Sequence, residues 1–263
     1  MGNLPKEGTT PIGVQENGEI FSLSLEERSG ILNLFGRSGQ GKSLTIENIV
    51  ISDILNGRSG LLIEPYGDLI KEIQLYVPAD KIKVFETQAG TLEENIARFQ
   101  QEIDFSEMTN GQLFILCQIN YQALGGDLTK DFGDYLVKQF LKVAGCKNCS
   151  LMIDEAHNSV SEEILEQVFE SKEEGLSCLF SDQSFTNYRA EFVGRLFEVS
   201  NHLICYLLNP EIADLLNKYN PDMSSDELTK LEQYHFLAKF NAKTATPTII
   251  KLKGIFPIPF SKK

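Results

Sequence analysis

The chain has 263 residues and a formal net charge of −13, with 37 acidic and 24 basic side chains. This length accommodates one large α/β domain, and the acidic balance argues against a protein that coats nucleic acid with a broad basic face. A ring that contacts DNA through a few pore residues is not excluded. No apolar run approaches the ~20 residues that a membrane span needs, and the first residues lack the basic flank and apolar core of a signal peptide. We therefore expect a cytoplasmic protein without a membrane span.

Predicted strands and helices alternate along the chain. An N-terminal region, residues 1–28, contains a hairpin around residues 15–18 and leads to strand 31–35, helix 43–56, strand 60–64, helix 68–76, strand 82–86, helix 91–103, strand 113–119 and helix 131–144. The second half continues with strand 151–155, helix 161–174, strand 176–181, helix 192–199, strand 202–208, helices 211–218 and 225–233, and strands 235–240 and 248–252. This alternation predicts an α/β fold, a mainly parallel sheet with helices on both faces. Residues 234–263 are expected to form an antiparallel C-terminal edge and a tail, and residues 1–263 to form a single domain.

The sequence G-R-S-G-Q-G-K-S, from Gly36 to Ser43, is a complete phosphate-binding loop between an apolar strand and a helix. Its glycines let backbone N–H groups converge on phosphate oxygens, Lys42 reaches the β- and γ-phosphates, and the Ser43 hydroxyl takes a position on Mg²⁺. The expected nucleotide-binding residues are Gly36, Arg37, Ser38, Gly39, Gln40, Gly41, Lys42, Ser43 and Leu44. The loop predicts binding of ATP with Mg²⁺, and the alternative is a decayed loop that does not hydrolyse.

A second acidic motif follows downstream of the loop. The apolar run from Leu151 ends in Asp154 and Glu155. A carboxylate at the end of a strand is placed to hold magnesium through water, and the adjacent glutamate can polarise the water that attacks the γ-phosphate. Together with the phosphate loop, this pair favours an ATPase that couples hydrolysis to movement over a kinase that phosphorylates a metabolite.

The next predicted strand delivers Asp182 and Gln183. If that strand lies between the strands of the loop and of the acid pair, Gln183 can sense the γ-phosphate. The alternative is an amide that caps its own loop.

Four motifs in this order resemble the FtsK/HerA superfamily, and within it the TraG/TraD-type coupling ATPases of conjugation and type IV secretion. They are the phosphate loop, E-P-Y-G-D at residues 64–68, L-M-I-D-E-A-H at residues 151–157, and E-G-L at residues 174–176 leading to Gln183. The resemblance runs from about Pro11 through Ile255, and Glu64 stands where the family typically has Asp. It implies a RecA-like motor domain of a hexameric ring that pumps DNA, with each nucleotide at a subunit boundary.

The resemblance also implies a positive side chain supplied by the neighbouring subunit. Lys172 stands where the family has arginine, and a lysine lacks the bidentate fork of a guanidinium. Arg189 and Arg195 are the candidate substitutes, although a solvated helix face is the simpler explanation for Arg195. Lys130 is a candidate DNA contact in the loop that starts at Gly125. The family's N-terminal membrane helices and inserted helical domain are not found here, so a membrane-anchored or secretion-system partner is the expected tether.

Two other functions stay open. A protein-handling secretion ATPase shares the loop, the acid pair and the glutamine, and a low-turnover ATP-binding switch would fit Lys172 and the small size. Cys146 and Cys149 have the spacing of a metal knuckle without a second pair, so a reduced loop is the simpler interpretation.

Overall fold

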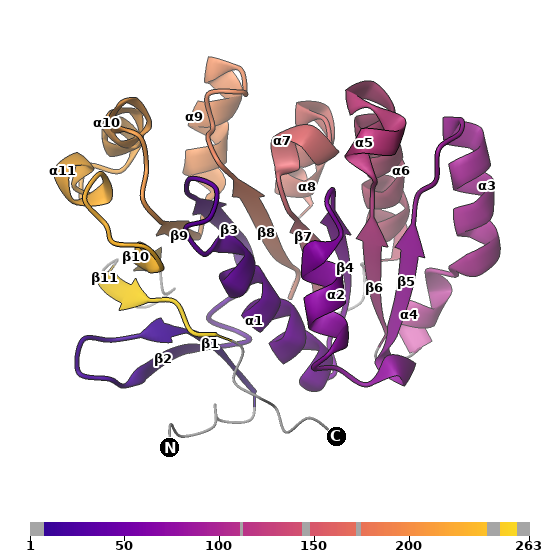
Figure 1. Cartoon of the computed structure of the whole chain (residues 1–263), viewed down its shortest axis with the longest axis horizontal. Coiled ribbons are helices and arrows are strands. Elements are labelled where there is room, and N and C mark those ends of the chain that lie inside the picture. Colours follow the sequence, from indigo (N-terminus) through magenta and orange to yellow (C-terminus); the bar gives the residue numbers. More distant parts are fainter. Residues whose placement is uncertain (1–7, 111–112, 144–147, 172–174, 241–247, 257–263) are drawn as a thin grey trace. The chain divides into compact units, whose positions relative to one another are not determined.

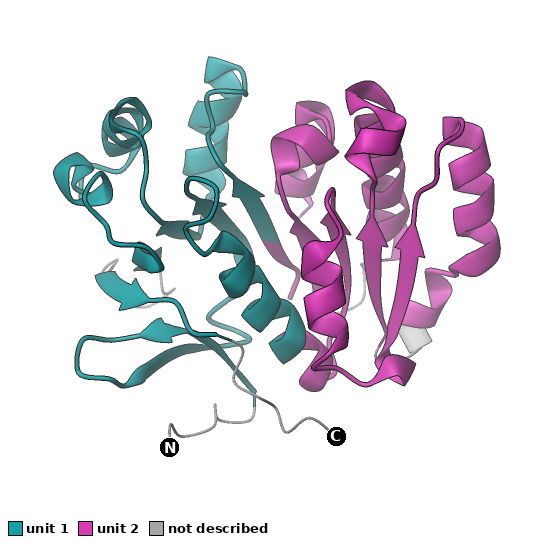
Figure 2. Cartoon of the chain, in the orientation of Figure 1, with its two compact units in different colours: residues 1–52, 179–258 teal, residues 53–178, 259–263 magenta. Residues whose placement is uncertain are grey.

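A computed structural model describes residues 8–110, 113–143, 148–171, 175–240 and 248–256. The chain divides into two compact units, coloured separately in Figure 2. Unit 1 consists of residues 1–52 and 179–258, and unit 2 of residues 53–178 and 259–263. The single domain spanning residues 1–263 stays a prediction.

The sheet of unit 1 combines strands from both ends of the chain (Figure 1). Its strands are β1 (Thr9–Val14), β2 (Ile20–Ser24), β3 (Gly30–Phe35), β8 (Ser177–Asp182, in this unit from Leu179 on), β9 (His202–Cys205), β10 (His235–Phe240) and β11 (Thr248–Lys253). They follow the order β2-β1-β11-β10-β9-β3-β8. Strands β3 and β9 are parallel, whereas the pairs β9–β10, β10–β11, β11–β1 and β1–β2 are antiparallel.

The helices of unit 1 are α1 (Lys42–Leu55, in this unit up to Ser52), α9 (Ala190–Val199), α10 (Pro210–Tyr219) and α11 (Ser225–Leu228). Helix α1 is deeply buried, since Ile46, Ile49 and Val50 are fully inaccessible to solvent. Pro210 occupies the first turn of α10, where its missing N–H costs no helical hydrogen bond. Apolar packing around α1 therefore fixes the position of the loop that precedes it.

Unit 2 contains a wholly parallel sheet in the order β7-β4-β6-β5. Its strands are β4 (Ser59–Glu64), β5 (Ile82–Glu86), β6 (Phe114–Gln118) and β7 (Cys149–Ile153). Its helices are α2 (Asp68–Gln74), the 3₁₀ turn η1 (Ala79–Lys81), α3 (Leu92–Glu102), α4 (Ser106–Asn110), α5 (Tyr121–Leu124), α6 (Gly126–Val143), α7 (Ala156–Ser159) and α8 (Glu162–Glu170). Every residue of β4 and β7 is buried, as expected of parallel strands covered on both faces.

A buried arginine joins several segments of unit 2. Arg58 is 3 % exposed and donates to the carbonyl oxygens of Cys149 and Gly175, each at 3.0 Å. Its Nε lies 3.9 Å from Oδ1 of Asp53, and Oδ2 of that aspartate accepts a hydrogen bond from Ser150. The guanidinium thus ties the start of β7 to the segment before β8.

The α/β class, the mostly parallel sheet and the antiparallel edge formed by β10 and β11 confirm the predicted fold class. Several predicted boundaries are wrong. Helix α8 ends at Glu170 rather than at residue 174, and β9 ends at Cys205 rather than at residue 208. Helix α6 begins at Gly126 rather than residue 131, directly after Gly125 ends α5 with φ 81°. Helix α11 ends at Leu228 rather than continuing to residue 233, because the residues that follow form hydrogen bonds to the phosphate loop described below.

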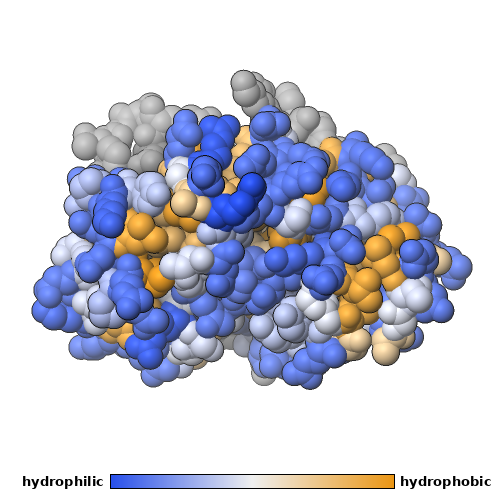
Figure 3. All heavy atoms as spheres, turned by 90° about the horizontal axis from the view of Figure 1, so that it is seen from above, coloured by the Kyte–Doolittle hydropathy of each residue, from blue (hydrophilic) through white to orange (hydrophobic). Residues whose placement is uncertain are grey.

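The face drawn in Figure 3 is mainly hydrophilic, with smaller hydrophobic areas between the polar side chains. Within the described ranges, no helix combines the length and the apolar character needed to cross a membrane.

Candidate nucleotide site

The phosphate loop leaves β3 in unit 1 and enters α1, as predicted. Gly39 and Gly41 have φ angles of 74° and 119°, in a region that side chains with a Cβ rarely adopt. A Cβ at Gly36 would lie 2.6 Å from Cβ of Tyr206, and one at Gly41 would lie 3.0 Å from the ring of Tyr234. The glycines are therefore required by backbone conformation and by close neighbours, and the loop cannot accept larger residues there without moving.

Hydrogen bonds from distant segments of unit 1 hold the loop backbone. The N–H of Gly36 donates to the carbonyl of Asp182 at 3.3 Å, and that of Arg37 donates to Leu207 at 3.1 Å. At the tip, the side-chain amide of Gln233 donates to the carbonyl of Gly39 at 3.0 Å. Next to it, the N–H of Tyr234 donates to the carbonyl of Gln40 at 3.0 Å. The loop is thus supported by the ends of β8 and β9 and by the segment before β10.

Lys42 and Ser43 stand at the start of α1 with different exposure. Lys42 is 7 % exposed, and its Nζ donates to the carbonyl of Gly36 at 2.8 Å, across the loop. Ser43 is exposed. Behind them, the hydroxyl groups of Thr45 and Tyr206 lie 2.8 Å apart, and burial raises the pKa of Tyr206 despite this hydrogen bond. In phosphate-binding loops of this kind the lysine ammonium contacts the phosphates and the serine hydroxyl contacts the divalent cation. Lys42 and Ser43 supply these two groups.

The predicted sensor follows β8 in the same unit. Asp182 is the last residue of β8 and is 2 % exposed, and its carboxylate accepts a hydrogen bond from the Tyr188 hydroxyl at 2.7 Å. Gln183, directly after the strand, is exposed. Since β8 is the neighbour of β3 in the strand order of unit 1, Gln183 follows a strand beside the one that carries the phosphate loop. Its role as a γ-phosphate sensor stays a prediction.

The acid pair lies in unit 2, directly after β7. Asp154 and Glu155 are 7 % and 5 % exposed, and the N–H of Asp154 continues the sheet by donating to Ile63 at 2.9 Å. Glu155 has φ 46° and ψ 57°, a left-handed conformation that costs a residue with a Cβ about 1–3 kcal/mol. Non-glycine residues in such conformations cluster at functional sites. His157 Nδ1 lies 3.9 Å from the Glu155 carboxylate.

Glu64, at the end of β4, adds a third buried carboxyl group to this part of unit 2. It is 2 % exposed, and its Oε1 accepts hydrogen bonds from the N–H groups of Tyr66 and Gly67, at 3.1 and 2.6 Å. Burial raises the pKa of Glu64 to about 7, with a smaller contribution from the charge of Asp154, and the two N–H donors oppose this rise. Burial also raises the pKa of Tyr66, and the charges of Glu155 and Asp154 raise it further by smaller amounts. The carboxyl groups thus influence one another, which is typical of sites that bind cations or move protons.

Of the three predicted trans-acting residues, the structure describes Arg189 and Arg195. Lys172 lies outside the described residues. Arg189 is exposed at the N-terminal cap of α9. Arg195, also exposed on α9, lies 3.1 Å from Glu198, and its trans-acting role stays a prediction.

Two minor predictions concern unit 2. Lys130 was expected in a loop, but it lies in the second turn of α6 because that helix starts at Gly126. Cys149 is a buried free cysteine at the start of β7, whereas Cys146, its expected partner in a metal knuckle, lies outside the described residues.

Sequence reasoning missed Gln233 and Tyr234 as supports of the phosphate loop. They lie far from it along the chain, and Tyr234 adopts φ 65° without being Gly or Asn. No local sequence pattern predicts a contact between segments so far apart in the chain. The E-P-Y-G-D motif did mark Glu64, although not its raised pKa.

At the level of sequence, the chain matches no protein-family model and no curated protein. Solved structures do share its fold. VirB4 of Thermoanaerobacter pseudethanolicus aligns with a TM-score of 0.69 at 11 % identity, over 97 % of this chain and 98 % of that one. The bacterial conjugative coupling protein TrwB, in a form named TrwBdeltaN70, aligns with a TM-score of 0.64 at 11 % identity, over 96 % and 90 % of the two chains.

A viral protein gives a third match. The genome packaging NTPase B204 of Sulfolobus turreted icosahedral virus 2, in complex with ATP-gammaS, aligns with a TM-score of 0.56 at 17 % identity. The alignment covers 86 % of this chain and 98 % of that one. The chain therefore has the fold of the FtsK/HerA-type P-loop ATPases, which confirms the resemblance at the level of fold.

Proposed function

We propose that the protein is an ATP-hydrolysing motor. The observation that carries this proposal is the phosphate loop of unit 1, complete in sequence and held in place by hydrogen bonds from three separate segments. A loop kept only for packing has no need of a buried lysine at its base or of two glycines with positive φ. We therefore assign nucleotide binding to residues 36–44.

In this proposal the loop binds and orients the triphosphate. Backbone N–H groups of the loop donate to the phosphate oxygens, and Lys42 exchanges the Gly36 carbonyl for the β- and γ-phosphates. Fixing the phosphates relative to the attacking water is the main contribution that a protein makes to phosphoryl transfer.

In unit 2, Glu155 is the proposed general base. It accepts a proton from the water whose oxygen bonds to the γ-phosphorus while the bond to ADP breaks. The Ser43 hydroxyl of unit 1 and the Asp154 carboxylate of unit 2 are each proposed as oxygen ligands of the kind that Mg²⁺ prefers. When bound, this ion would neutralise charge on the β- and γ-phosphates. Gln183 senses the γ-phosphate. Lys172, Arg189 or Arg195 supplies positive charge to a neighbouring subunit's nucleotide.

The proposed cargo is DNA, moved by a hexameric ring that a secretion-system or membrane-anchored partner tethers in the cytoplasm. The names of structural neighbours support this choice, since they include a genome packaging NTPase and a conjugative coupling protein. Sequence identities of 11–17 % to those proteins leave a protein-handling motor and a low-turnover ATP-binding switch as the competing functions.

The test is ATP hydrolysis with and without DNA, at low and moderate salt, over a range of protein concentrations. A DNA-translocating ring gives severalfold stimulation by DNA, and its specific activity rises with protein concentration. Hydrolysis that is indifferent to DNA would instead identify a protein-handling motor, and tight ATP binding without hydrolysis would identify a switch.

A further inference from the structure

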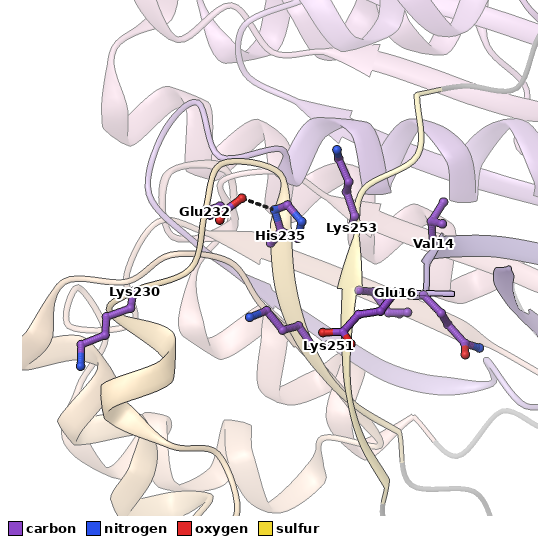
Figure 4. Close-up of a pocket in the computed structure, with 9 residues that line it drawn as sticks. Val14, Glu16, Lys230, Glu232, His235, Lys251 and Lys253 are labelled. Carbon is purple, nitrogen blue, oxygen red and sulfur yellow. Dashed lines mark ion pairs between the residues drawn. The ribbon is translucent and has the colours of Figure 1, made fainter. Parts of the chain in front are cut away.

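Unit 1 contains a second polar site, a pocket of about 430 Å³ that is separate from the residues of the phosphate loop (Figure 4). It lies where β1 and β11 end and β10 begins. Its lining consists of Val14, Gln15, Glu16, Lys230, Glu232, His235, Lys251, Leu252 and Lys253. Three lysines and a histidine thus meet two acids in a chain whose acidic residues outnumber its basic ones by 37 to 24.

Strand register places His235, Lys251 and Lys253 on one face of the sheet. Lys253 pairs with His235 on one side and with Val14 on the other, and Lys251 pairs with Leu237. Residues paired across strands, and residues two apart along one strand, share a face. Lys251 and Lys253 are exposed, whereas Leu252 between them is 1 % exposed and points to the opposite face. Figure 4 shows the basic side chains projecting from β10, β11 and the segment that precedes β10.

Two of these cations are free to meet a ligand. Lys230 forms an ion pair with Asp226 at 2.5 Å, and His235 lies 3.9 Å from Glu232. Lys251 and Lys253, by contrast, form no ion pair with any residue that the structure describes. Lysines on edge strands commonly prevent sheets from joining. That explanation does not apply to Lys253, because this residue pairs with Val14 of β1 as well as with His235 of β10.

The polar, lysine-containing lining of the pocket favours a phosphate-bearing polymer over a small molecule as the ligand. Sites for small molecules are mostly apolar with a few polar groups, whereas Val14 and Leu252 are the only aliphatic residues in this lining. Lysines placed about 7 Å apart along an extended strand instead suit successive charges of a polyanion. Nucleic-acid backbones are held mainly by such phosphate contacts.

The pocket is also connected to the phosphate loop within unit 1. Between them runs the segment 232–235, in which Gln233 and Tyr234 bond to the carbonyls of Gly39 and Gln40. The N–H of Gly254, the residue after Lys253, donates to the carbonyl of Tyr234 at 2.7 Å. A ligand that moves Lys253 or His235 therefore acts on residues that hold the loop tip.

We propose that this pocket is a phosphodiester-binding site, through which nucleic acid contacts unit 1 and influences the phosphate loop by way of residues 232–235. The inference rests on the proposed function, for which it names a DNA contact. Lys251 and Lys253 bind backbone phosphates, and Glu16, the acid of the lining without an ion pair among the described side chains, limits the affinity.

The test measures binding of a labelled duplex oligonucleotide, and of a single strand of the same length, to the full chain at several salt concentrations. The double variant Lys251→Gln/Lys253→Gln should bind roughly tenfold more weakly, and the slope of log affinity against log salt should shrink by about two. Glu16→Gln should bind more tightly. The matched control is Lys138→Gln/Lys142→Gln on α6, which removes the same charge from exposed positions in unit 2 and should bind as the wild type does.

If both double variants bind the oligonucleotides equally more weakly than the wild type, the effect comes from net charge and the proposed site is overturned. Unchanged binding in Lys251→Gln/Lys253→Gln would also overturn it. Lost self-association in that variant, measured by light scattering, would make the pocket a contact between copies and also overturn the proposal. If the wild type hydrolyses ATP but binds neither nucleic acid, the DNA function itself fails, and the site fails with it. If the wild type binds both the duplex and the single strand, but only single-strand binding weakens in Lys251→Gln/Lys253→Gln, the proposal is supported and the site is a single-strand contact.

Discussion

The two units present their proposed catalytic groups in different ways. Unit 1 offers a loop of backbone N–H groups whose shape depends on glycines and on hydrogen bonds from distant segments. Unit 2 offers buried carboxyl groups at the ends of adjacent parallel strands, and for Glu64 burial raises the pKa more than its two N–H donors lower it. The loop is thus sensitive to changes in conformation, whereas the acidic end is sensitive to changes in charge and sheet packing. Single substitutions in the two units can separate these two sensitivities.

Replacing Arg58 by Met should destabilise unit 2 most strongly. The change leaves Asp53 buried without its cation and removes donors to the carbonyls of Cys149 and Gly175. Breaking a buried pair in this way costs about 3–5 kcal/mol, which urea unfolding would measure. Lys71→Met, which breaks an exposed pair with Asp68, is the control and should change little. Similar unfolding free energies for the two variants would contradict the role of Arg58.

Gly41→Ala should weaken nucleotide binding by roughly tenfold or more, because a positive φ costs alanine about 1–2 kcal/mol and the added Cβ meets Tyr234 and Tyr206. Gly39→Ala has a similar φ problem, but no atom lies within 4 Å of its Cβ, so the loss should be smaller. Titration with a fluorescent ATP analogue compares the two variants. The reverse order of affinities would show that contacts with the tyrosines do not shape the loop.

Gln233→Ala should weaken ATP binding by a factor of about 2 to 10, because it removes one hydrogen bond to the Gly39 carbonyl, worth about 0.5–1.5 kcal/mol. The same titration measures this effect. Gln122→Ala, at an exposed position of unit 2, is the control and should bind ATP as the wild type does. An unchanged affinity in Gln233→Ala would mean that the loop tip needs no support from the segment before β10.

The smallest expected effect is a dependence of stability on pH that arises from His202 in unit 1. Burial lowers the pKa of His202 below its ordinary 6.5, so the folded protein protonates this ring at a lower pH than the unfolded chain does. As the pH falls through 6.5, the unfolded chain takes up a proton that the folded chain does not, and stability decreases. His202→Gln should therefore lose less in melting temperature than the wild type between pH 7.5 and 5.5. An equal or larger loss in the variant would refute this account.

Local patterns predicted much of the fold and of the site. The phosphate loop is recognisable because its chemistry depends on consecutive residues, and Asp154 and Glu155 because a buried strand ends there. The antiparallel strands β10 and β11 also lie where their apolar runs predict.

Other features depend on the folded context. Gln233 and Tyr234 contact the loop from the other end of the chain, and no spacing rule connects them to it. The left-handed backbone of Glu155 follows from its place between β7 and α7, not from its residue type. The basic pocket emerges only when register sets Lys253 beside His235, since in sequence these lysines resemble a solvated tail.

The central claim is that the loop of unit 1 binds ATP and that the acid pair of unit 2 hydrolyses it. The most direct test measures ATP binding and turnover in parallel for the wild type, Lys42→Ala and Glu155→Gln. We expect Lys42→Ala to lose binding, and Glu155→Gln to bind ATP normally while its turnover falls by about 10²- to 10⁴-fold. Normal turnover in Glu155→Gln, or unchanged ATP affinity in Lys42→Ala, would contradict the account.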